Sequence, residues 1–173
     1  RGLARACDVY VDRGAYTVDE ARALLETARD LGLATKMHAG QFTDQGGPEL
    51  IAGIGWLSAD HLEVISDAGI EALAASGVRY INIPVDWRNP TAEDFATFSR
   101  TLAAAGDEQV LVHCQMNMRA SVFTFLHRVT HDDVAPAGAA GRVSRPEGGC
   151  VLSGCGGLRA ARGVQSLGRT RGS

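Results

Sequence analysis

The chain has 173 residues, of which 45% are hydrophobic, and a net charge of −3 at pH 7. It is long enough for one hydrophobic core, and no apolar run approaches the roughly 20 residues of a membrane-spanning helix. Its four cysteines are too few for a disulfide-rich scaffold, which favours a reducing, cytoplasmic location. The composition therefore argues against a membrane protein and a small secreted domain. Because the chain begins at Arg1 rather than methionine, we expect an incomplete or processed product.

Strands and helices are predicted to alternate along the first part of the chain. Short apolar runs predict strands at residues 7–11, 33–38 and 57–62. Helical spacing of apolar residues predicts helices at residues 18–31, 48–54 and 66–76. The first helix has the clearest signals, since Thr17 and Glu20 form a capping box before it and Gly32 follows it. Gly77 marks the end of the third helix.

The same alternation continues after Gly77. Strands are predicted at residues 78–85 and 109–113, and helices after the cap residue Thr91 and at residues 120–129. Alternating elements imply an α/β fold with a mainly parallel sheet, either open or forming part of a TIM-barrel-like structure. In both cases ligand chemistry gathers at the carboxyl ends of the strands. Four candidate residues fall at or just after such ends: His38, His61, Asp86 and Cys114.

The last segment has a different composition. From Gly138 to Ser173 there are six arginines, one acidic residue and ten of the 21 glycines, but no Tyr, Phe or Trp. Such a segment buries too little apolar surface to offset the entropy of ordering it. We therefore predict that residues 135–173 form a disordered tail. Nucleic-acid binding is not expected, because no aromatic residues are interspersed among the arginines.

Several motifs before Gly77 concern a possible metal site. A histidine at a strand end can bind a divalent metal, and a second one can act as acid or base. The relevant stretches are Lys36-Met37-His38-Ala39, Gly46-Gly47-Pro48-Glu49-Leu50 and Ser58-Ala59-Asp60-His61-Leu62-Glu63. Residues 7–77, which contain these stretches in order, resemble imidazolonepropionase, a family of the amidohydrolase superfamily that hydrolyses a cyclic C–N bond in histidine degradation.

This resemblance implies roles for particular residues. His38 would be a ligand of zinc or iron, His61 the catalytic histidine, and Gln41 a residue close to the substrate. Gly40 departs from the acidic residue expected there. The family also uses a His-x-His pair and an aspartate, and the chain contains no His-x-His. Since a catalytic zinc normally has about three protein ligands, we expect that this chain alone neither retains the metal nor carries the full activity.

A second constellation follows the strand at residues 109–113. Cys114 begins a short loop that leads to Arg119 and a helix, an arrangement that suits an anion. Residues 78–134 resemble bacterial protein tyrosine phosphatase-like proteins in Tyr80-Ile81-Asn82-Ile83-Pro84-Val85, in Pro90-Thr91-Ala92-Glu93-Asp94-Phe95 and in the stretch from Val112 to Ser121. The resemblance implies that Cys114 is the nucleophile, that Arg119 and Ser121 assist it, and that Asp86 is a general acid.

The loop departs from that family's pattern. It has four residues between Cys114 and Arg119 instead of five, and it contains no glycine. A positive φ would therefore have to be adopted by Asn117. Cys114 could also be a buried thiol with no chemical role, or part of an anion site without turnover. Nearby, His127 and His131 have a spacing that would suit a metal, but we expect them on a solvated helix face.

Three hypotheses for the whole chain remain open. The first is a hydrolase-derived chain of the imidazolonepropionase type, incomplete as an enzyme. The second is a phosphatase-like or phosphate-binding module, and the third is a chimeric product without function. We expect units at residues 1–77, 78–134 and 135–173. The expected partner is a small-molecule substrate or an anion, and no membrane partner is expected.

Overall fold

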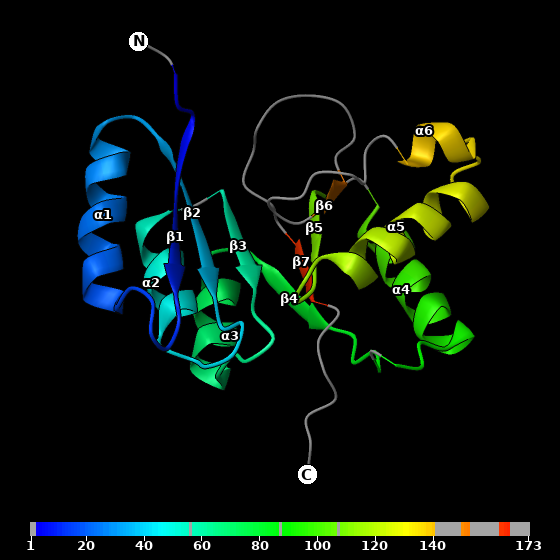
Figure 1. Cartoon of the computed structure of the whole chain (residues 1–173), viewed down its shortest axis with the longest axis horizontal. Helices are drawn as coiled ribbons and strands as arrows, with labels where there is room; N and C mark the ends of the chain where they lie inside the picture. The colour runs from blue at the N-terminus through cyan, green and yellow to red at the C-terminus, as the bar shows by residue number, and fades with distance from the viewer. Residues whose placement is uncertain are drawn as a thin grey trace.

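The computed structural model describes residues 3–55, 57–86, 88–106, 108–140, 150–152 and 163–166. Strands and helices alternate as predicted, and every predicted element before residue 131 is present (Figure 1). The elements are β1 (Ala6–Val11), α1 (Val18–Asp30), β2 (Ala34–Ala39), α2 (Gly47–Ile54), β3 (Ser58–His61), α3 (Asp67–Ala75), β4 (Arg79–Asn82), α4 (Ala92–Ala105), β5 (Val110–His113), α5 (Met118–Thr130), α6 (Pro136–Ala140), β6 (Cys150–Leu152) and β7 (Gly163–Ser166). The predicted α/β class is confirmed.

The first sheet is a parallel sheet of three strands in the order β1-β2-β3. Side chains alternate between its two faces because successive residues of a strand point in opposite directions. One face packs against α1, α2 and α3, and its core includes Val11, Met37 and Ala59 from the strands and Leu25, Ile51 and Leu73 from the helices. The register places Asp8 opposite Lys36 and His38 opposite Asp60, so polar residues occupy the other face.

A second core lies between the following strands and helices. It contains Ile83 and Val85 after β4, Val110 and Val112 of β5, and Phe98 and Phe123 from α4 and α5. The second sheet has the order β4-β7-β5-β6, in which β6 is antiparallel to β5 and the other pairs are parallel. Strand β4 ends at Asn82, before Pro84, which has no N–H group to donate to a sheet. The described residues form two sheets, β1-β2-β3 and β4-β7-β5-β6.

Part of the predicted disordered tail is described. Within residues 135–173 the structure has the short helix α6 and the strands β6 and β7, whereas residues 141–149, 153–162 and 167–173 lie outside the described residues. Val78 and Tyr80 belong to the first core and Ile81 to the second. The division into units at Gly77 stays a prediction. None of the helices in the described part of the chain has the length and apolar character that a bilayer span requires.

Hydrogen bonds between described residues join the two halves of the chain. The Tyr80 hydroxyl donates to the Leu62 carbonyl at 2.7 Å, and Gln41 Nε2 donates to the Gln115 carbonyl at 3.0 Å. The His61 ring also bonds the backbone of Cys114. Residues Gln41, His61 and Gln115 all lie at or just after the carboxyl ends of β2, β3 and β5. The two halves therefore meet at the strand ends where the sequence places its candidate residues.

Candidate functional site

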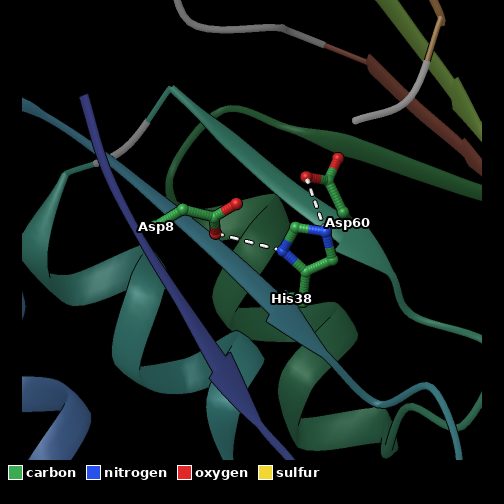
Figure 2. Close-up of side chains that lie close together, drawn as sticks. All are labelled: Asp8, His38 and Asp60. Carbon is green, nitrogen blue, oxygen red and sulfur yellow. Dashed lines mark hydrogen bonds and ion pairs between the residues drawn. The ribbon is translucent and has the colours of Figure 1, made fainter. Parts of the chain in front are cut away.

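Asp8, His38 and Asp60 form a cluster on the polar face of the first sheet (Figure 2). They come from the neighbouring strands β1, β2 and β3, and one ligand atom from each lies within 4.8 Å of the others. His38 Nδ1 is 3.1 Å from Asp8 Oδ1, while His38 Nε2 is 4.0 Å from Asp60 Oδ2. The first distance is a hydrogen bond, and the second is too long for one. His38 therefore holds Asp8 with one nitrogen and turns the other toward Asp60.

The carboxylate of Asp60 is the most buried group of the cluster, with a side chain only 4% exposed. Its Oδ2 atom lies 3.6 Å from Lys36 Nζ and 3.5 Å from Ser58 Oγ. The other oxygen, Oδ1, is buried and has no hydrogen-bond partner among the described residues. Lys36 Nζ is also 3.9 Å from Asp8 Oδ2, so a lysine lies between the two carboxylates.

The charges of this cluster shift the affinity of its members for protons. The hydrogen bond to Asp8 raises the pKa of His38, although burial opposes this. Burial alone would raise the pKa of Asp8, but the hydrogen bond and charge of His38, with the charge of Lys36, hold that pKa below its usual range. Asp8 is thus an anion near neutral pH, and it fixes a hydrogen on His38 Nδ1.

His61 ends β3, and its ring lies beside the cluster. Its ring centroid is 5.2 Å from that of His38. Burial, and then the nearby charge of His38, lower the pKa of His61, so its ring is neutral near pH 7. Its backbone has a φ of 76°, and Leu62 follows with a φ of 55°. Such angles are unusual for residues other than glycine and occur often at functional sites.

Gln41 also lines the site. It borders an open pocket of about 380 Å³ together with Asp8, Val9, Tyr10 and His38. Its loop is held by Asp12, whose carboxylate accepts hydrogen bonds from the backbone of Phe42 at 2.9 Å and of Thr43 at 3.1 Å. Burial by itself would raise the pKa of Asp12, but these hydrogen bonds and one from the Thr43 hydroxyl lower it. The structure thus places two predicted residues, His38 and Gln41, at one pocket.

The Cys114 loop adopts the conformation expected from its sequence. Asn117 has a φ of 57° and precedes α5, so the predicted positive φ is confirmed. Cys114 is only 2% exposed and packs in the second core. Arg119 is 7% exposed, and its Nη1 donates to the Val85 carbonyl at 3.0 Å. Ser121 Oγ donates to the Asn117 carbonyl at 2.6 Å.

Asp86 lies one residue after the Val85 carbonyl that Arg119 contacts. Its side chain is exposed, and Oδ1 accepts a hydrogen bond from the Arg88 backbone at 2.8 Å. The structure therefore places Arg119 against the segment that carries Asp86. The roles predicted for Cys114, Arg119, Ser121 and Asp86 stay predictions.

The expectation that His127 lies on a solvated helix face is wrong. His127 is 8% exposed, and its Nδ1 is 3.1 Å from Ser99 Oγ. Its ring stacks on His131 with centroids 4.7 Å apart. The apolar pattern of α5 did not reveal this, because the contacts of the His127 ring with Ser99 and Phe98 of α4 are not visible in the local sequence.

Sequence reasoning missed four other residues near the site. Asp8, Lys36 and Asp60 interrupt apolar strands at alternate positions, and that period of two could have placed them on the face of His38. The fourth, His113 of β5, is 2% exposed, and neither ring nitrogen has a hydrogen-bond partner among the described residues. Burial, followed by the charges of His61 and His38, lowers the pKa of His113 to about 3.

Part of the chain is homologous to known hydrolases. These relatives are named imidazolonepropionase. That of Myxococcus xanthus is 49% identical over 83 residues, which is 48% of this chain and 20% of the relative. That of Anaeromyxobacter dehalogenans is 46% identical over 102 residues, 59% of this chain and 24% of the relative. That of Stenotrophomonas maltophilia is 48% identical over 83 residues.

The comparisons support one of the two predicted resemblances. The chain spans only a fifth to a quarter of the length of the curated relatives it matches. No family model matches it. The partial resemblance to imidazolonepropionase is confirmed. Nothing in the comparisons supports the phosphatase-like segment at residues 78–134, which stays a prediction.

Proposed function

We propose that this chain carries part of a metal-dependent amidohydrolase site, which acts on a cyclic C–N bond as in imidazolonepropionase. The observation that supports this most is the His38 ring, which lines an open pocket, is held by Asp8 through Nδ1 and directs Nε2 toward the buried Asp60. The partial homology to imidazolonepropionase supports the same class of reaction.

The residues present fit a zinc or iron ion. One imidazole nitrogen and two carboxylates form a donor set that both metals accept. Asp60 Oδ1 is a buried oxygen without a partner in the described part of the chain, as expected of an atom that awaits a cation. We therefore assign Asp8, His38 and Asp60 as the metal-holding residues. These three residues can supply the metal ligands even though the sequence contains no His-x-His pair.

The chain's own residues would position the substrate and move protons. Before a metal binds, the Asp8 carboxylate fixes the tautomer of His38 by accepting the Nδ1 hydrogen. His61 is neutral near pH 7, and its ring centroid lies 5.2 Å from that of His38, so a movement that exposes the ring would let it act as a general base. Gln41 offers an amide at the pocket edge. A bound divalent metal supplies Lewis acidity and makes water easier to deprotonate.

Zinc titration of the purified chain by calorimetry tests the metal site. We expect about one equivalent to bind the chain. His38→Asn should abolish this binding, whereas His131→Asn, at an exposed histidine that directly follows α5, should leave it unchanged. Absence of zinc binding by the wild-type chain, or equal binding by both variants, would overturn the assignment. Hydrolysis is assayed separately, since the chain is much shorter than its relatives.

A second candidate function is phosphate binding or phosphate-ester hydrolysis by residues 78–134. The tight turn at Asn117 and the buried guanidinium of Arg119 two residues later favour this function. Phosphate or vanadate should then slow the alkylation of Cys114 and leave that of the partly exposed Cys7 unchanged. Equal effects on both thiols would exclude an anion site at this loop.

A chimeric product without function is the third hypothesis. The hydrogen bonds that Gln41 and Tyr80 make across the two halves argue for joint folding. Thermal unfolding followed by calorimetry should therefore give one cooperative transition. A chain that melts gradually without a transition would support the third hypothesis.

A further inference from the structure

Lys36 is the only lysine of the sequence, and its ammonium group lies inside the cluster assigned to a metal. Its Nζ atom is 3.6 Å from Asp60 Oδ2 and 3.9 Å from Asp8 Oδ2. The side chain is 22% exposed and comes from β2, two residues before His38 on the same face of the sheet. The lysine thus contacts both carboxylates of the site from the centre of the sheet.

The two carboxylates need a positive charge. Asp60 is almost fully buried, and a buried carboxylate without a counter-ion is strongly destabilising. Lys36 supplies this charge within the described part of the chain, because His38 Nε2 lies farther from Asp60, at 4.0 Å. A metal at Asp60 would supply the same charge to the same carboxylate. An ammonium group and a divalent ion about 4 Å apart repel each other strongly in a partly buried site.

We propose that Lys36 is an internal cation that occupies the metal site until a divalent ion displaces it. This inference rests on the proposed metal site and adds a control on its occupancy. The lysine side chain has four rotatable methylene groups and a strongly hydrated ammonium, so it can leave the carboxylates for solvent while staying charged. The 380 Å³ pocket beside Asp8 and His38 is open, which gives such a movement room.

Acylation of the wild-type chain tests the displacement without any mutation. Lys36 carries the only ε-amine, so acetic anhydride modification can be followed at one peptide by mass spectrometry. The amine of a free lysine derivative in the same mixture is the internal control. We expect zinc to increase the acylation rate of Lys36 at least roughly fivefold, because an ion-paired amine is held away from the reagent. Zinc binding with an unchanged Lys36 rate would overturn the proposal.

Zinc affinity of matched variants provides the second test. Lys36→Met removes the competing charge at similar length and should bind zinc at least roughly tenfold more tightly. Lys36→Arg keeps the charge and should bind near the wild-type level. Arg22→Met removes a charge from the exposed part of α1, on the other side of the sheet, and should change nothing. Equal affinities of wild type and Lys36→Met would overturn the proposal.

The outcomes separate the inference from the metal site itself. If zinc binds the wild-type chain and neither the acylation rate nor the Lys36→Met affinity changes, the metal site stands and the lysine has no part in it. If zinc binds neither the wild-type chain nor Lys36→Met, both the metal site and the inference are wrong. Should Lys36→Met fail to fold for want of a counter-ion, the acylation experiment on the wild-type chain decides alone.

Discussion

The buried imidazole of His113 makes a quantitative prediction about stability and pH. Its pKa is about 3 in the folded chain, against 6.5 for an ordinary histidine. Below 6.5 the unfolded chain therefore binds a proton that the folded chain rejects, and stability falls as the pH falls toward 3. This residue alone should reduce the free energy of unfolding by about 2 kcal/mol between about pH 7.5 and about pH 5, and by about 5 kcal/mol in total.

Urea denaturation of the wild type and of His113→Leu at both pH values measures this effect. Leucine removes the titrating ring and two nitrogens that lack partners among the described residues, so we expect the variant to be at least as stable as the wild type near neutrality. Its loss of stability toward about pH 5 should be smaller by about 2 kcal/mol. Arg22→Gln, at a half-exposed site on α1, should keep the wild-type dependence. If the free energies of unfolding of the wild type and of His113→Leu decrease equally with falling pH, the reasoning is refuted.

Three further substitutions test the loops around the site, each by urea denaturation. Asp12→Asn weakens the hydrogen bonds to Phe42 and Thr43 and should cost about 2 kcal/mol; an unchanged midpoint would contradict this. Asn117→Gly should be neutral or stabilising, whereas Asn117→Ala should cost about 1 kcal/mol because of its positive φ. Gly40→Ala should destabilise far more than Gly14→Ala, since both glycines have positive φ but only a Cβ at Gly40 collides with the Val64 carbonyl.

The sequence predicts the elements well because their signals are local. The Thr17–Glu20 capping box and the cap at Thr91 are present where the residue types predict them. The positive φ at Asn117 followed from the lack of glycine in its loop. Each of these features depends on neighbours within a few residues, which is the range that a sequence pattern describes.

The composition of the site was less predictable, because it depends on which strands are neighbours. His38 and His61 could be singled out at strand ends, but Asp8 and Asp60 join His38 only through the register of three strands. The position of Lys36 between two carboxylates follows from the same register. The burial of His113 depends on the packing of β5, which has no counterpart in its local sequence.

The hydrogen bond from His61 to the Cys114 backbone has a consequence for dissecting the chain. A histidine that donates one ring hydrogen to a fixed carbonyl has its tautomer chosen by that carbonyl. A shortened chain ending at Gly77 would retain His61 but lose this acceptor, so the proton would distribute between both ring nitrogens. The chemistry of the first half is therefore set partly by the backbone of the second.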